Sequence, residues 1–217
     1  MDPISTINFR KYQPSDKAAL RQIVYDTALI GESAGKFFEG QEIITDALCL
    51  YFTDYEPDAA FVAQDHGQVV AYLIGAKDKI RAEKIFNRRI AFPLLLKALR
   101  NGVFLKSKNL GFFIRGLKDL LINGAKTPDF TQEYPATLHI NVQSGFRGLG
   151  IGQKLIDIFL SYLKQENIPG VHLATMSDAA AGFFLAQGFT QLYKGKRSYF
   201  RHILHRDVPL YIFGKRL

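Results

Sequence analysis

Hydrophobic and polar residues change their spacing several times along the chain, and each change marks an expected element. Residues 8–13 alternate like a short strand, and a Pro-Ser-Asp turn then offers a helix N-cap at Ser15 or Asp16. Two apolar runs between residues 60 and 78 are separated by Asp-His-Gly, which has hairpin turn chemistry. The first third of the chain is therefore expected to hold a strand, a helix and an antiparallel pair.

Helical spacing dominates the middle of the chain, in residues 91–102 and 109–124. The apolar positions of the second segment are Leu110, Phe113, Ile114, Leu117, Leu120 and Leu121. This pattern predicts a pair of amphipathic helices within a basic helical insertion at about residues 79–126. Their Leu and Phe faces are expected to pack on the domain or on a partner, with Lys and Arg turned outward.

In the last part of the chain, segments with the two-residue period of a strand alternate with segments that have the helical period of 3.6 residues. This pattern predicts strands at 136–142, 170–175, 189–195 and 208–217, a helix at 149–165 and a short helix at 178–188 that Gly188 closes. There is no internal repeat and no convincing linker. The expected fold is α/β (α+β) in a single domain, residues 1–217.

Charge is concentrated in one segment. The formal net charge is +8, yet residues 76–126 hold 13 Lys and Arg against 3 Asp and Glu, and the rest of the chain holds 15 against 17. A basic patch of this kind suits an anionic group or an anionic surface rather than a protein that is basic all over. No nucleic-acid partner is expected.

Cysteine usage and the N-terminus narrow the cellular setting. Cys49 is the one cysteine, so no intrachain disulfide forms, and no Cys/His cluster has the spacing of a metal site. The N-terminus lacks the pattern of a signal peptide, and no apolar run approaches the ~18 residues of a membrane span. A cytoplasmic protein without a metal is expected.

Three glycines at alternate positions, Gly148, Gly150 and Gly152, lie between an expected strand and an expected helix. Glycines there let the backbone approach a ligand and direct free N–H groups at an anion, supported by the helix dipole. The turn lacks the Gly-Lys-Ser/Thr ending of a nucleoside triphosphatase loop, and Gln153 stands where the dinucleotide pattern needs glycine. The glycines therefore match neither of these two phosphate-binding turns.

Arg147-Gly148-Leu149-Gly150-Ile151-Gly152 resembles the pyrophosphate turn of the GNAT superfamily of acyl-CoA-dependent N-acetyltransferases. Downstream, the segment SDAAAGFFLAQGF is similar to a second motif of that superfamily. The resemblance covers nearly the whole chain and implies a mixed, mostly antiparallel sheet flanked by helices, with the helical insertion before the CoA-binding strand. More narrowly, EYPATLHINV is similar to acetyltransferase-like proteins related to the domain that accompanies some O-GlcNAc hydrolases.

The resemblance implies how acetyl-CoA would be held. The strand at residues 138–142 separates from its neighbour, so that backbone groups of Ile140 and Val142 bind the pantetheine arm and polarise the thioester. The pyrophosphate would lie on the backbone of Arg147, Gly148, Leu149, Gly150, Ile151 and Gly152, and Ser177 and Phe184 are further expected CoA contacts. The Arg147 side chain has an alternative role in a surface ion pair.

The expected catalytic residues depart from the family's pattern. The family's usual general acid is a tyrosine where this chain has Phe184, and Ser177 replaces an expected asparagine, so Tyr193 or Tyr199 is a reassigned acid, with Tyr199 preferred. His139 is the candidate base that deprotonates an ammonium substrate, with Asn141 as a substrate contact. A bulge in this strand would change which of the two faces the pocket.

The expected activity is transfer of an acetyl group from acetyl-CoA to a primary amine of a small molecule or peptide. Glu32, Tyr55 and Asp78 are candidate acceptor contacts by position only. Two alternatives stay open: a CoA-binding regulatory or sensor protein without transferase activity, and a peripheral module that binds a membrane or polyanion. Because Pro93, Gly102, Gly111 and Gly116 interrupt the insertion, at most weak and salt-sensitive membrane contact is expected. A homodimer is left open.

Overall fold

The structure is a computed structural model that describes residues 6–123 and 127–217. Its strands are β1 (Ile7–Lys11), β2 (Ala60–Asp65), β3 (Gln68–Ala76), β4 (Ala136–Val142), β5 (Gly170–Thr175), β6 (Thr190–Arg197) and β7 (Val208–Arg216). Its α-helices are α1 (Lys17–Thr27), α2 (Gln41–Asp54), α3 (Lys79–Ile85), α4 (Ala91–Arg100), α5 (Ser107–Asn123), α6 (Ile151–Gln165), α7 (Asp178–Ala186) and α8 (Arg201–Leu204). Short 3₁₀ turns lie at Pro14–Asp16, Ala34–Lys36, Pro57–Ala59, Val103–Leu105 and Ser144–Phe146.

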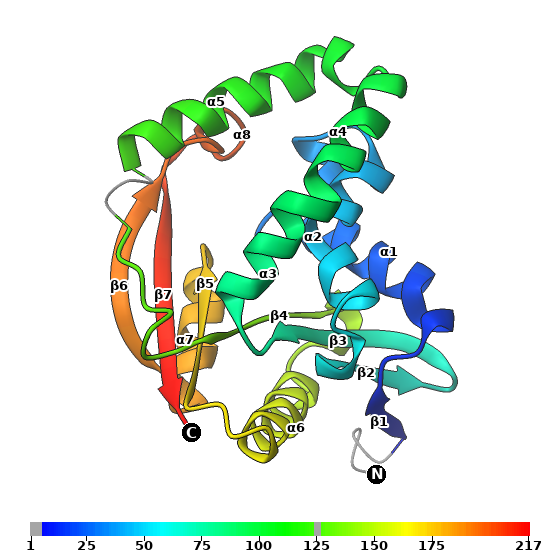
Figure 1. Ribbon diagram of the computed structural model, residues 1–217, viewed down its shortest axis with the longest axis vertical. Helices are drawn as coiled ribbons and strands as arrows, with labels where there is room; N and C mark the ends of the chain where they lie inside the picture. Colours follow the sequence, from blue (N-terminus) through cyan, green and yellow to red (C-terminus); the bar gives the residue numbers. More distant parts are fainter. Residues whose placement is uncertain (1–5, 124–126) are drawn as a thin grey trace.

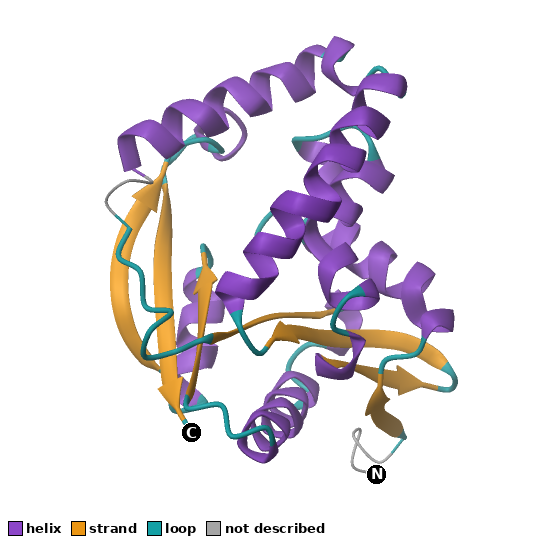
Figure 2. Cartoon of the chain, in the orientation of Figure 1, coloured by secondary structure: helices purple, strands orange, loops and turns teal. Residues whose placement is uncertain are grey.

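The strands form one seven-stranded sheet in the order β1-β2-β3-β4-β5-β7-β6, and only the β4–β5 pair is parallel (Figures 1 and 2). The expected hairpin is present, with His66 and Gly67 at positive φ in its turn. A mixed, mostly antiparallel sheet flanked by helices is the architecture that the sequence predicts. That residues 1–217 form a single domain stays a prediction.

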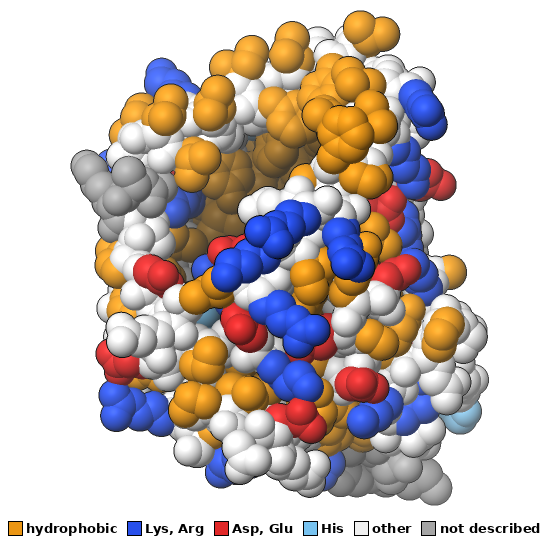
Figure 3. All heavy atoms as spheres, in the orientation of Figure 1, with side chains coloured by type: hydrophobic (Ala, Val, Ile, Leu, Met, Phe, Trp, Pro, Cys, Tyr) orange, Lys and Arg blue, Asp and Glu red, His pale blue; other side chains and the backbone are white. Residues whose placement is uncertain are grey.

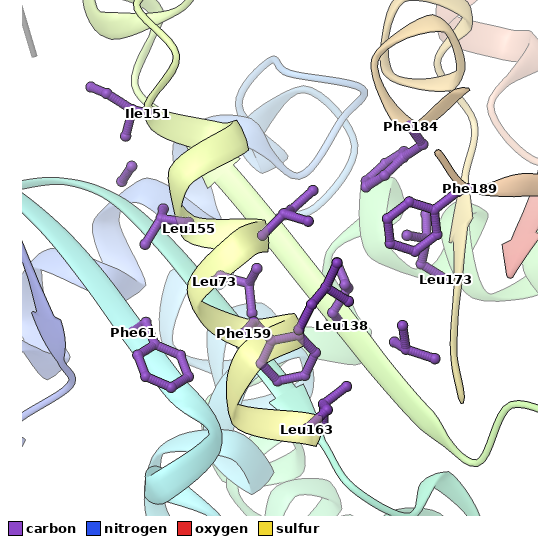
Figure 4. Packing of buried hydrophobic residues seen from close by; sticks show 14 of the residues in the cluster. Phe61, Leu73, Leu138, Ile151, Leu155, Phe159, Leu163, Leu173, Phe184 and Phe189 are labelled. Atoms are coloured by element: carbon purple, nitrogen blue, oxygen red, sulfur yellow. The ribbon is translucent and has the colours of Figure 1, made fainter. Parts of the chain in front are cut away.

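Side-chain alternation along the strands builds one core on each face of the sheet. On one face α6 packs against alternate residues of the central strands, and Figure 4 shows Leu155, Phe159 and Leu163 of this helix beside Leu73 and Leu138. The opposite face is covered by α1 and α2, which enclose the other set of alternate residues, among them Val62, Tyr72 and Ile74. The site described below lies where these two layers meet β4.

The insertion between β3 and β4 contains more helix than the expected pair. Helix α3 continues through a π-helical turn, Phe86–Ile90, into α4, and α5 follows after a short 3₁₀ turn. Pro93 lies in the first turn of α4, where its missing N–H and its ring would disturb a regular helix, and the π turn directly before it absorbs that disturbance. Residues 124–126, the end of the predicted insertion, lie outside the described residues.

Helix α2 is the element that the sequence pattern missed. Its buried positions include the polar side chains of Thr45, Asp46 and Thr53 as well as Ile43 and Cys49. An inward face that mixes polar and apolar residues hides the helical period of hydrophobicity.

Candidate functional site

Strand β4 has an open edge. It pairs with β5 only through Ala136↔Val171 and Thr137↔His172, and beyond these residues the two strands diverge (Figure 1). On its other side β4 stays paired with β3 in an unbroken register from Thr137 to Val142. Residues 138–142 are therefore paired along one edge only.

The backbone groups on the open edge can be identified from their neighbours. The N–H of Gln143 donates to Val70 O on β3 at 2.9 Å, whereas Val142 O accepts from Arg147 Nε at 3.1 Å on the other side. Because backbone groups alternate sides along a strand, those of Ile140 and Val142 face the open edge. These are the two residues that the sequence predicts to bind the thioester arm.

The glycine-rich turn lies at the end of the same strand. Gly148 and Gly150 both have φ of 79°, a left-handed conformation that favours glycine, and Gly150 is the N-cap of α6. Among the described residues, none accepts a hydrogen bond from the N–H groups of residues 148–153. These N–H groups, together with the positive end of the α6 dipole, form a cradle for an anion.

Gly152 has a second requirement, which comes from packing. A Cβ on this residue would lie 3.3 Å from Cζ of Phe183 and 3.8 Å from Cδ1 of Ile140. The start of α6, helix α7 and the open edge of β4 therefore meet at Gly152, and a larger residue would push them apart.

Arg147 does not form the surface ion pair that the sequence left open, as far as the described residues show. Its guanidinium instead donates to two backbone carbonyls, Val142 O and, at 3.4 Å, Gly31 O. It therefore joins the turn to the loop after α1, with its side chain exposed.

His139 and Asn141 share one face of β4, because no bulge interrupts the strand and Ala136 and Leu138 pack on the α6 side. Asn141 Nδ2 donates to the hydroxyl of Tyr72 at 2.6 Å, and Tyr72 is fully buried. The structure therefore directs both candidate residues away from α6, toward α1 and α2.

Part of the His139 side chain is exposed to solvent, and protein atoms surround the rest of it. The ring of Phe52 from α2 lies 5.5 Å from the imidazole, edge to face. Desolvation by the surrounding protein lowers the pKa of His139 below its ordinary 6.5, because the charged form loses more from it than the neutral form does. At neutral pH the imidazole is the unprotonated base.

A hollow opens on this face of the sheet, opposite α6. It is bordered by α5, α4 and the β6–β7 side of the sheet, and hydrophobic side chains line it (Figures 1 and 3). The hollow and the glycine turn thus lie on different sides of β4.

Tyr199 reaches the carboxyl end of β5 from the segment after β6. Its hydroxyl contacts Met176 Sδ at 3.2 Å, and its ring packs on Phe112 and Phe200. Burial raises the pKa of Tyr199 to about 12, so the phenol is protonated at neutral pH and is a weaker acid than an ordinary tyrosine.

Two of the expected CoA contacts have other roles in this fold. Ser177 caps α7, since its hydroxyl oxygen accepts from Ala180 N at 3.3 Å. Phe184 is 4% exposed and its ring packs on Phe189 and Phe213 in the core. Phe184, expected as a CoA contact, thus has its ring in the core, and its contact with CoA stays a prediction.

The remaining candidates are tied into local structure. Glu32 pairs with Lys36, Asp78 caps α3 through Arg81 N, and Tyr55 stacks on Tyr51. His172 is buried with Nδ1 2.5 Å from Tyr134 O, as expected for a structural histidine. No group of three or more metal-ligating residues occurs within residues 6–123 and 127–217.

Sequence reasoning missed the partners that support the candidates. Tyr72 of β3 contacts Asn141, and Phe52 of α2 lies beside His139. Met176, in the connection between β5 and α7, contacts Tyr199. Aromatic and Met residues in apolar segments give no signal of such a role, because core positions have the same composition.

No family model matches the sequence, but solved structures share the fold. SsHAT is 24% identical, with a TM-score of 0.74 over 97% of this chain and 98% of that chain. The polyamine N-acetyltransferase of Drosophila melanogaster is 15% identical, with a TM-score of 0.65 over 97% and 100%. The putative acetyltransferase yncA of Salmonella typhimurium, solved with acetyl-CoA, is 14% identical, with a TM-score of 0.58 over 98% and 95%. The chain therefore has the GNAT-like fold of solved acetyltransferases.

Proposed function

We propose that the protein is an N-acetyltransferase that moves an acetyl group from acetyl-CoA directly to a primary amine. The observation that carries the proposal is the open edge of β4 beside the free N–H groups of residues 148–153. One feature suits a thioester arm and the other a pyrophosphate, and they are adjacent along the chain. The shared fold with solved acetyltransferases supports the same assignment.

The backbone at the open edge would supply the main electrostatic term. N–H groups of Ile140 and Val142 point away from β3 and are fixed by the paired side of the strand. Donors held in this way stabilise the negative charge that develops on a thioester oxygen, each typically by about 3 kcal/mol. The turn would hold the pyrophosphate, so that the reacting carbon lies against β4.

His139 and Asn141, on the face of β4 opposite α6, have side chains that can bind and deprotonate the acceptor amine. His139 is neutral at neutral pH and can accept the proton that an ammonium group must lose before it attacks. Asn141 has its Nδ2 engaged by Tyr72, which leaves Oδ1 directed as an acceptor for the amine. The new C–N bond then forms as the C–S bond breaks.

Tyr199 is the candidate acid that returns a proton to the departing thiolate, because its phenol is protonated at neutral pH. Burial raises its pKa, which makes it a weaker acid than an ordinary tyrosine. Phe184 cannot donate a proton, which removes the family's usual acid from this chain. A thiol with an ordinary pKa near 8.5 leaves readily, so an acid would assist the step without being essential.

CoA binding is tested by a matched pair of glycine substitutions. Gly148 and Gly67 have φ of 79° and 84°, and a Cβ on either residue would meet nothing within 4 Å. Gly148→Val and Gly67→Val therefore impose similar backbone strain, but only the first narrows the turn. Calorimetry should show loss of CoA binding for Gly148→Val alone. Equal affinity in the two variants would place the pyrophosphate elsewhere.

The base is tested by pH. Because the pKa of His139 is lowered, kcat/KM for thiol release should rise with pH below 6.5 and be flat near neutrality. His139→Gln should remove this limb and lower the plateau by about 100-fold. An unchanged profile would exclude His139 as the base.

The alternative, a CoA-binding regulator without transferase activity, is favoured by Phe184 and is separated by the same assay. CoA binding with no thiol release on any amine would support the regulator. The narrower similarity to domains that accompany O-GlcNAc hydrolases, the acceptor amine and the cytoplasmic location stay predictions.

A further inference from the structure

Helix α5 is held to the rest of the protein by the ring of Phe112, which packs on Phe37 and Phe200, and by two buried polar residues. Asn109 is completely buried: its Oδ1 accepts from Glu39 N and its Nδ2 donates to Glu39 O, both at 2.7 Å, and also to Val103 O. Nearly three turns further on, Asp119 is buried and accepts from Ser198 N at 2.6 Å, with Arg197 beside it at 3.6 Å. These two anchors fix which side of α5 faces inward.

The apolar stripe of the same helix therefore faces solvent. Its members range from 39% exposed at Phe113 to 72% at Leu121. The exposed stripe consists of Leu110, Phe113, Ile114, Leu117, Leu120 and Leu121. Leu105, in the turn before α5, is 91% exposed. In Figure 3 hydrophobic side chains follow the outer edge of the molecule over α5.

The expected interruption of this surface does not occur on α5. At 100° per residue, Gly111 and Gly116 project from other sides of the helix than the stripe, so the stripe is continuous over three turns. The sequence predicts that the Leu and Phe faces pack on the domain or on a partner. On α5 Phe112 packs on Phe37 and Phe200 of the domain, whereas the six residues of the stripe are exposed. That a partner covers the stripe stays a prediction.

The charge around the stripe is positive. Residues 91–123 contain six Lys and Arg and a single acidic residue, the buried Asp119. Lys97 pairs with Glu42 and Asp46 of α2, whereas Arg100 and Arg115 form no ion pair among the described residues. Lys118 is exposed, next to Leu117 and Leu121 on the helix surface, and forms no ion pair within the described part of the chain. Lys106 and Lys108 lie at the start of α5, at 3.4 and 3.5 Å from Glu39.

We propose that α5 lies in the surface of an anionic lipid bilayer, with the exposed stripe inserted at the boundary between headgroups and acyl chains. An apolar stripe bordered by cations is what this environment stabilises. A second copy of the chain would bring two basic surfaces together, which disfavours a dimer through α5. No helix of residues 6–123 and 127–217 is long and apolar enough to cross a membrane, so the contact is one of surface insertion.

Sedimentation with vesicles tests the proposal. The parent protein should bind vesicles of equal parts phosphatidylglycerol and phosphatidylcholine, and bind phosphatidylcholine alone more weakly. Leu117→Gln with Leu121→Gln should lower the partition coefficient by on the order of tenfold for each leucine. The control is Leu185→Gln, at a residue 53% exposed on α7, which should leave partitioning unchanged.

The salt dependence of vesicle binding distinguishes insertion of the apolar stripe from binding by charge attraction alone. Binding should fall as salt rises but persist at physiological ionic strength, because the apolar term is not screened, and Lys118→Gln should lower it about fivefold. No binding by the parent, equal binding by the double leucine variant, or binding that disappears at physiological salt would each overturn the proposal. A parent dimer in sedimentation velocity that the double variant converts to a monomer would assign the stripe to a second copy instead.

Discussion

Helices α5 and α6 have the same kind of amphipathic sequence and opposite orientations. In α6 the apolar residues Ile151, Leu155, Ile156, Phe159 and Leu163 are buried against the sheet. In α5 an equally regular set of Leu, Ile and Phe is exposed, and the buried residues are Asn109 and Asp119. Hydrophobic period shows that a helix exists, but it does not show which side of the helix meets the protein.

The difference comes from what each helix can hydrogen-bond. The inward side of α5 meets backbone groups of Glu39, Val103 and Ser198, which need polar partners when buried. Helix α6 meets the side chains on one face of the sheet, so apolar contacts suffice. Helix α5 is attached by these hydrogen bonds and by the ring of Phe112, which packs on Phe37 and Phe200, and its apolar stripe is available for another surface.

The largest expected effect contrasts one apolar residue on each helix. Phe159→Ala should lower the free energy of unfolding by about 3 to 5 kcal/mol, because the ring is fully buried and packs over Gly75. Leu117→Ala should change it by less than about 0.5 kcal/mol, since Leu117 is 60% exposed. Urea unfolding measures both. A large loss for Leu117→Ala would mean that the stripe packs on the protein in solution.

A smaller effect tests the polar attachment of α5. Asp119→Ala leaves Arg197 without its carboxylate and Ser198 N without an acceptor, which should cost about 3 kcal/mol. The exposed Asp157 on α6 provides the control, since Asp157→Ala should be near neutral. Hydrogen exchange should speed up in α5 of the Asp119 variant and not in α6. Faster exchange in both helices alike would show that α5 is not a separately attached element.

The CoA-binding side of the fold could be predicted from sequence because its signals are local. The glycines at 148, 150 and 152 are required by left-handed backbone and by close packing, and both requirements act on residues adjacent in the chain. The direction of α5 depends on Glu39 and Ser198, which are 70 and 79 residues from their partners. No local pattern carries that information.

In the candidate site, too, some features could be predicted from the sequence and others could not. The open backbone of Ile140 follows from strand order, and the shared face of His139 and Asn141 follows from an unbroken register that the sequence could not establish. Phe184 looked like a substituted catalytic position, but only the packed structure places its ring among Phe189 and Phe213. Motif positions predict backbone geometry better than side-chain environment.

The smallest expected effect comes from replacing one glycine in α5 and one glycine beneath α6. Gly116 lies inside α5, and a Cβ there would meet nothing within 4 Å, so Gly116→Ala should raise the free energy of unfolding by about 0.5 to 1 kcal/mol through helix propensity alone. Gly75, beneath α6, allows no such gain, because its Cβ would overlap the ring of Phe159 and come within 2.8 Å of Thr137 O. Gly75→Ala should therefore destabilise the protein by about 1 to 3 kcal/mol. Urea unfolding measures the change in the free energy of unfolding for each variant. The two changes should have opposite signs, because α6 packs closely over Gly75 whereas the space around Gly116 is open. Two changes of the same sign would contradict this contrast between the helices.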